Sequence, residues 1–217
     1  MQYYQLEYSL DPAEVGTTFP QSHIARQPVR IDDPRYLGRQ DTGQSLRRIP
    51  LPEPVVHPDA KLSDLLSTVA TWRMLMSEKL KSVLEPFIYP AESEFLQVKV
   101  HYVSDHFDYW MFNPIHFNMD AINFGASETW LCGIGNLRIE KVNLDSFASY
   151  EDYQNLVKLP EHLLISNLVL TDNPGRDFLQ LKNVNGIKYY VSENLRQQLV
   201  NSRCTGLRFT KLQKITE

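Results

Sequence analysis

Residues 76–84 run Met76-Ser77-Glu78-Lys79-Leu80-Lys81-Ser82-Val83-Leu84, where the end of a strand is followed at once by the start of a helix. Ser77 can accept a hydrogen bond from an amide of the first helical turn, and Glu78 lies where the helix dipole favours an anion. Apolar side chains then recur at helical spacing. The stretch therefore predicts a short strand over residues 72–76 and a helix that begins after Ser77.

A second stretch repeats this pattern, Val191-Ser192-Glu193-Asn194-Leu195-Arg196-Gln197-Gln198-Leu199. Both stretches contain Ser-Glu, any residue, Leu, a basic residue, any two residues and Leu, and a further strand is expected after each helix. The pattern predicts a repeated strand–helix–strand unit. Because the chain shows no regular βαβ alternation, we expect an α+β fold with a mixed or antiparallel sheet and a few helices.

Other segments show the alternation or the short apolar runs that are typical of strands. We expect strands over residues 2–8, 95–103, 109–112, 115–119, 129–134, 136–143, 163–170, 178–181, 188–191 and 207–212. A weaker pattern predicts a helix over residues 150–156. Gly206 allows the chain to turn into the last strand.

Residues 11–60 differ in character, because they contain eight of the thirteen prolines. Proline removes a backbone donor and restricts its neighbour, so long helices and central strands are not expected there. The apolar side chains of this arm indicate that it packs on the core. We therefore predict an N-terminal strand plus arm over residues 1–60, an α+β core over residues 61–217, and one compact domain overall.

The composition excludes several classes of protein. The 217 residues carry a net charge of −4, and no apolar run is long enough to span a membrane. The N-terminus has neither the basic nor the apolar region of a secretory signal. Cys132 and Cys204 lack the CxxC spacing, which favours free thiols in a reducing compartment. These features predict a cytoplasmic protein.

No motif predicts catalysis or a cofactor. Gly133-x-Gly135 lacks the third glycine of a dinucleotide loop, and no phosphate-binding lysine loop or nucleophile elbow occurs. The prediction is a protein that is not an enzyme and needs neither cofactor nor metal. One alternative is a small metal-dependent enzyme, whose ligands would come from His101, Asp105, His106, Asp108 and His116, although their spacing matches no known metal motif.

A second alternative is a nucleic-acid-binding module. The arm carries six arginines that could meet phosphates: Arg26, Arg30, Arg35, Arg39, Arg47 and Arg48. The net negative charge of the chain argues against nucleic acid as the main partner.

Four carboxylates gather within thirteen residues, with two tyrosines beside them. These six candidate partner-binding residues are Glu140, Asp145, Tyr150, Glu151, Asp152 and Tyr153. A protein with a basic active site, such as a nuclease, would meet this patch well, because complementary charge raises association rate and specificity. A solvated sheet edge is the alternative interpretation.

Three stretches together resemble the family of bacterial polymorphic-toxin immunity proteins numbered eleven, formerly a domain of unknown function. They are Tyr3-Tyr4-Gln5-Leu6, the segment from Tyr109-Trp110-Met111-Phe112-Asn113 to Phe117-Asn118-Met119-Asp120-Ala121-Ile122-Asn123, and the tail from Tyr190 to Phe209. The resemblance implies a protein that binds a cognate toxin domain and occludes its active site. It implies no catalytic residues.

Overall fold

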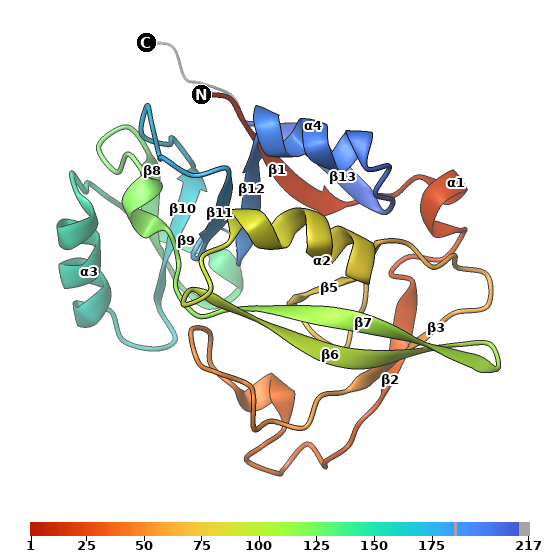
Figure 1. Cartoon of the computed structure of the whole chain (residues 1–217). Coiled ribbons are helices and arrows are strands. Elements are labelled where there is room, and N and C mark those ends of the chain that lie inside the picture. The colour runs from red at the N-terminus through yellow and green to blue at the C-terminus, as the bar shows by residue number, and fades with distance from the viewer. Residues whose placement is uncertain (185, 213–217) are drawn as a thin grey trace. The chain divides into compact units, whose positions relative to one another are not determined.

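The computed structural model describes residues 1–184 and 186–212, and these form an α+β fold in which strands predominate (Figure 1). The predicted fold class is confirmed. The described helices are α1 (Pro12–Val15), α2 (Glu78–Leu84), α3 (Phe147–Leu156) and α4 (Glu193–Asn201). Short 3-10 turns are η1 (Leu37–Arg39), η2 (Glu85–Phe87), η3 (Met119–Ala121) and η4 (Ile134–Asn136).

The strands follow most of the predicted segments. They are β1 (Tyr3–Tyr8), β2 (Ser22–Arg26), β3 (Glu53–Val56), β4 (Leu65–Leu66), β5 (Met74–Met76), β6 (Ser93–Tyr102), β7 (Asp105–Pro114), β8 (Glu128–Cys132), β9 (Arg138–Val142), β10 (His162–Asn167), β11 (Phe178–Leu181), β12 (Lys188–Ser192) and β13 (Leu207–Lys211). No described helix is long and apolar enough to cross a membrane. Both cysteines are free.

Contacts divide the chain into two compact units. The first unit comprises Met1–Gln5, Phe117–Glu193 and Lys211–Glu217, and the second comprises Leu6–His116 and Asn194–Thr210. These limits differ from the predicted division after residue 60, because segments near both ends of the chain join each unit.

The second unit is built on a mixed sheet with the strand order β2-β3-β6-β7-β5-β4. The hairpin β6/β7 is its longest pairing, and it runs from Ser93 opposite Pro114 to Tyr102 opposite Asp105. Only the β3–β6 pairing is parallel among the pairings described for this sheet. Apolar side chains from the sheet and the arm share one core, among them Leu37, Leu46, Val100 and Met111.

The expectation that the proline-rich arm contributes no central strand is wrong. β3 lies between β2 and β6, with Pro54 opposite Ala25 of β2. Its pairing with β6 involves Val55 and Val56, opposite His101 and Tyr102. Pro54 is not paired with a residue of β6, so the backbone N–H that proline lacks removes no hydrogen bond between β3 and β6.

The first unit contains the antiparallel sheet β10-β8-β9 and the hairpin β11/β12. In the wider strand order β11-β12-β1-β13, both β1 and β13 contribute residues to each unit. The core of the first unit is aliphatic and aromatic, and it includes Phe124, Tyr150, Leu163 and Leu179.

The predicted strand over residues 115–119 does not form, and the chain turns there into η3. The reason is a pair of hydrogen bonds with β11. The amide of Asn118 donates to the carbonyl oxygen of Gln180 at 2.9 Å, and the amide of Gln180 donates to the Asn118 side-chain oxygen at 2.9 Å. The side chain of Asn118 thus takes the place that a second strand would occupy.

The two Ser-Glu-x-Leu stretches adopt the same local structure. Ser77 ends the hairpin β4/β5, and its amide donates to the carbonyl oxygen of Asp64 at 2.8 Å. Ser192 ends the hairpin β11/β12, and its amide donates to the carbonyl oxygen of Asp177, also at 2.8 Å. Each serine hydroxyl in addition donates to the carboxylate of the same aspartate.

A helix and then a strand follow each of these hairpins, α2 and β6 in one case and α4 and β13 in the other. The predicted repeat is therefore a hairpin–helix–strand unit closed by a serine–aspartate pair. Neither aspartate belongs to the sequence pattern, because each comes just before the strand opposite the serine.

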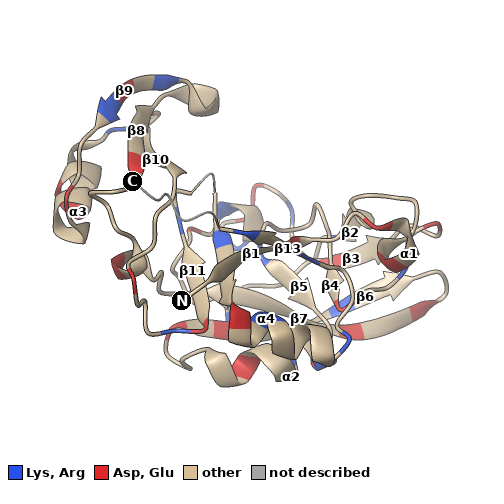
Figure 2. Cartoon of the chain, turned by 90° about the horizontal axis from the view of Figure 1, so that it is seen from above, with Lys and Arg blue, Asp and Glu red and all other residues tan. Residues whose placement is uncertain are grey.

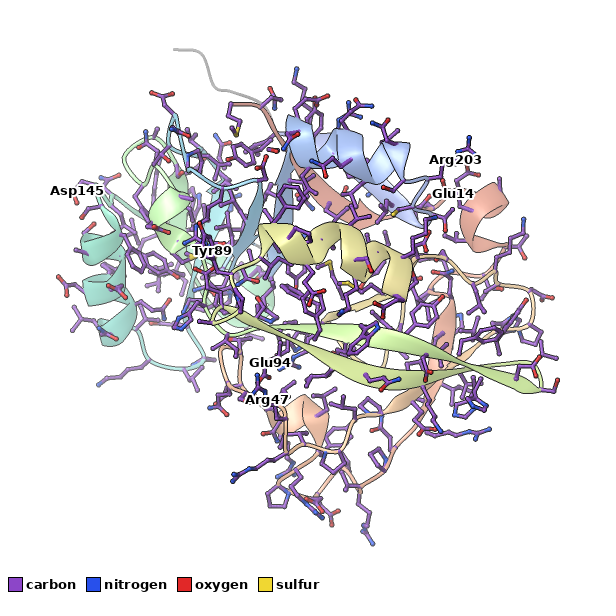
Figure 3. The ribbon with its side chains drawn as sticks, viewed as in Figure 1. Glu14, Arg47, Tyr89, Glu94, Asp145 and Arg203 are labelled. Carbon is purple, nitrogen blue, oxygen red and sulfur yellow. The ribbon has the colours of Figure 1, made fainter. Side chains whose placement is uncertain are left out.

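One buried carboxylate, that of Glu94 on β6, binds the proline-rich arm to the rest of the second unit. Glu94 accepts hydrogen bonds from the Ser45 hydroxyl at 2.6 Å and the Leu46 amide at 2.9 Å, and it pairs with Arg47 at 3.0 Å (Figure 3). Burial raises the pKa of Glu94, but these donors and the Asn113 amide outweigh it and hold the pKa below its usual value. The carboxylate therefore stays charged while the arm is in place.

Ser77→Ala tests the serine–aspartate pair. The substitution removes the N-terminal cap of α2, where Ser77 accepts from the Leu80 amide, and also a hydrogen bond to a carboxylate. We expect a loss of about 2–3 kcal/mol in the free energy of unfolding, measured by urea denaturation. The matched control is the exposed Ser82→Ala, which should change stability by less than about 0.5 kcal/mol. Equal effects of the two substitutions would contradict the role assigned to Ser77.

Glu94→Gln tests the fastening of the arm. Because the folded-state pKa of Glu94 is lowered, its contribution to stability is complete above the unfolded-state pKa of about 4.3 and is lost as the pH falls below it. We expect the variant to be about 2–3 kcal/mol less stable at neutral pH, and to lose less stability than the wild type when the pH is lowered.

Limited proteolysis at neutral pH supplies a second measurement. Trypsin should cut the arm of Glu94→Gln at Arg47 and Arg48 faster than it cuts the wild type. Glu151→Gln, at an exposed position, is the control. Unchanged cleavage in Glu94→Gln would show that this carboxylate does not hold the arm.

Candidate partner-binding surface

Five of the six predicted residues lie on or near the surface of the first unit. Glu140 is on β9, Asp145 precedes α3, and Glu151 and Asp152 are on α3; all four are exposed. Tyr153 on α3 is half-buried. Figure 2 shows carboxylate residues on both β9 and α3. We call Glu140, Asp145, Glu151 and Asp152 the acidic surface.

β9 presents its residues to solvent because it is an edge strand. It pairs only with β8 in the described sheet, and the register shifts by one residue between Leu131 and Cys132. The residues from Arg138 to Lys141 are all exposed. The guanidinium of Arg138 lies 4.8 Å from the centre of the Trp130 ring, which gives the edge a fixed cation.

The start of α3 is fixed by a capping box. The Ser146 hydroxyl accepts from the Ser149 amide at 3.2 Å, and the Ser149 hydroxyl accepts from the Ser146 amide at 3.1 Å. Asp145 stands just before this helix (Figure 3). Hydrogen bonds with the Ser146 and Ser149 side chains lower its pKa, so the acidic surface is charged at neutral pH at this position.

One hydrogen bond joins the two elements of the acidic surface. The Tyr153 hydroxyl on α3 donates to the Glu140 carboxylate on β9 at 2.7 Å. This bond and the nearby carboxylate charge raise the pKa of Tyr153, because both disfavour the phenolate. Two residues that the sequence predicted together are thus in contact.

Tyr150 differs from the expectation, because it lies in the core. Its side chain is 1% exposed and packs on Phe124, with the ring centres 5.1 Å apart. The Asn183 amide donates to its hydroxyl. Tyr150 follows Phe147 by one helical turn, which places both on the inner face of α3. It cannot touch a partner directly, and we leave it out of the proposed surface.

Sequence reasoning missed the exposed aliphatic side chains of the first unit. Leu159 is 93% exposed, Ile134 80%, Leu156 76% and Leu137 71%. Leu137 and Ile139 alternate with polar residues in the predicted strand over residues 136–143, which is typical of a half-buried strand, but both are exposed. The available signals were Gly133 and Gly135 around Ile134, and Pro160 after Leu159, since these residues mark loops.

The alternative sites gain no support from the described residues. His101 lies opposite His106 in the β6/β7 hairpin and contacts Glu53 at 2.6 Å. Within residues 1–184 and 186–212, however, no three His, Cys, Asp or Glu side chains form a group that could hold a metal.

Several arginines of the arm are already engaged by neighbours. Arg30 pairs with Asp32 at 3.1 Å and Arg35 with Asp33 at 2.9 Å. Arg39 donates to the Ile31 carbonyl oxygen at 2.9 Å, and Arg47 pairs with Glu94. These contacts reduce the positive charge that the arm can offer to phosphates.

Comparison with known proteins does not extend the resemblance. The chain matches no protein-family model and no curated protein.

Glu140→Gln tests the bond between β9 and α3. Removal of the negative charge should lower the pKa of Tyr153, which can be followed by NMR titration of isotope-labelled tyrosine. Glu151→Gln, also on α3, should leave the Tyr153 resonance unchanged and is the control. A Tyr153 pKa that is the same in wild type and Glu140→Gln would show that the two side chains do not interact in solution.

Proposed function

We propose that this protein is an immunity protein, which binds a cognate toxin domain and neutralises it by occluding the active site. The observation that carries the proposal is the acidic surface, whose carboxylates come from two elements joined by the Glu140–Tyr153 hydrogen bond. The resemblance of three stretches to an immunity family points in the same direction. The site of action we propose is the cytoplasm.

The chemistry of the acidic surface suits a basic target. Nucleases bind phosphates through cationic active sites, so a set of exposed carboxylates can take the place of the nucleic acid backbone. Opposite charge also steers the two proteins together and raises the association rate. The proposed target is therefore a toxin domain that acts on nucleic acid.

The proposed role requires an extended and fixed surface. Neutralisation at low protein concentration needs a dissociation constant of about nanomolar or below, near −12 kcal/mol. Such complexes bury about 800 Å² on each partner and depend on a few well-placed side chains. The capping box of α3 and the Tyr153–Glu140 bond hold the carboxylates in place before binding, which lowers the entropy cost of association.

Charge reversal tests the proposal. An immunity protein is encoded beside its toxin, so the chain is co-expressed with the C-terminal domain of the protein encoded immediately upstream of its gene. Cell growth and the association rate of the purified proteins are measured. We expect the variant Glu140→Lys, Glu151→Lys, Asp152→Lys to associate at least about 10-fold more slowly at low salt and to protect poorly.

The matched control reverses three exposed aspartates of the second unit, Asp41→Lys, Asp105→Lys and Asp108→Lys. It changes the net charge by the same amount and should keep protection. If the wild-type chain fails to bind the toxin domain, the proposed function is wrong. If both variants bind equally well, the acidic surface is not the contact.

A further inference from the structure

Four strongly exposed aliphatic side chains of the first unit come from two loops at one end of a sheet and from the end of α3 beside one of them. In the antiparallel order β10-β8-β9, Cys132 at the end of β8 lies opposite His162 at the start of β10 and Arg138 at the start of β9. The β8–β9 loop and the α3–β10 loop therefore emerge at the same end. Ile134, Leu137 and Leu159 are exposed aliphatic residues of these loops, and Leu156 is exposed at the end of α3; we call these four residues the aliphatic tip.

The two loops are held in place by hydrogen bonds. In the β8–β9 loop the Gly133 amide donates to the Leu137 carbonyl oxygen at 2.8 Å. Between the loops, the His162 ring and the Asn136 side-chain oxygen are 2.8 Å apart. Gly135 has a φ of +69°, a conformation that favours glycine and lets the chain reverse beside Ile134. The aliphatic side chains therefore stand on a backbone with defined geometry.

Exposure of four large aliphatic residues at one end of a sheet is costly in an unbound protein. Each of these side chains exposes apolar area to water, and burial of that area would be favourable. Exposed apolar patches mark interaction sites. None of the four belongs to the buried core of the first unit. Packing within the unit therefore does not account for them.

Charges of both signs lie beside the tip, since the exposed Arg138 follows Leu137 and the exposed Lys158 precedes Leu159, with carboxylates farther along both elements. Glu140 is the third residue of β9, after Arg138 and Ile139, and α3 carries Glu151 and Asp152 in its middle. We infer that the aliphatic tip is the anchor of the complex with the toxin domain and seats in an apolar pocket beside its basic active site. The inference rests on the proposed function and names the part of the surface that holds the partner once charge has brought it near.

The two parts of the surface should act on different rate constants. Carboxylates act over about 8 Å at physiological salt and mainly set the association rate. Aliphatic side chains act only in contact, so they set the dissociation rate and depend little on salt. A membrane surface would also accept exposed aliphatic residues, so binding to lipid vesicles is measured separately.

The test uses the full chain with Ile134→Ser, Leu137→Ser and Leu159→Ser, and the upstream-encoded toxin domain as the probe. We expect the dissociation rate to rise on the order of 100-fold, with an association rate within about 3-fold of wild type at every salt concentration. The matched control is Ile24→Ser, Ile31→Ser and Val69→Ser, three exposed aliphatic residues of the second unit. It should dissociate as the wild type does.

The outcomes separate this inference from the proposed function. If the wild-type chain binds the toxin domain and the tip variant dissociates at the wild-type rate, the tip is not the anchor, while the proposed function stands. If the wild-type chain does not bind, both fail. Co-sedimentation with phosphatidylcholine–phosphatidylglycerol vesicles gives a third outcome, since binding that the tip variant loses would assign the tip to lipid and overturn the inference.

Discussion

The carboxylate of Asp64 joins segments of the second unit that are far apart in the sequence. It accepts from the Ser77 hydroxyl at 2.6 Å, from Lys79 at 3.1 Å, and from the amide of Thr205 at 2.8 Å. Burial raises the pKa of Asp64, but these donors outweigh it and keep the carboxyl charged. Gly206, which follows Thr205, has a φ of +77°, and a Cβ at this position would lie 2.4 Å from the Leu65 carbonyl oxygen. The start of α2 and the turn into β13 are thus fixed against one strand.

A carboxylate of this kind occurs twice, once beside each Ser-Glu-x-Leu stretch. In both hairpins the serine hydroxyl lies beside the residue that precedes the opposite strand, and that residue is an aspartate. The serine then begins a helix while its hydroxyl is held by Asp64 or Asp177. Helix capping is local, so the serines could be predicted from sequence. The aspartates could not, because they depend on the hairpin register, 13 and 15 residues away.

The same division between local and distant interactions governs the rest of the fold and the candidate site. Strands with clear alternation and the capped helix α2 were predictable, since neighbours along the chain determine them. The central position of β3 was not, because it follows from two residues paired with β6. The exposure of Glu140, Asp145, Glu151 and Asp152 was predictable, because charged side chains are rarely buried without a partner. Tyr150 was misplaced, because its burial depends on Phe124, which lies 26 residues earlier in the sequence.

Charge and apolar area on the first unit make complementary demands on a partner. A surface with only the carboxylates would bind many basic proteins, because screened charge discriminates poorly between them. A surface with only the aliphatic tip would favour self-association, because apolar contacts have no direction. Together they select a partner that is basic and also has an apolar pocket at a matching position. The fixed β8–β9 loop and the capped α3 hold the two sets in constant relation, so the selectivity is built into the fold before any partner arrives.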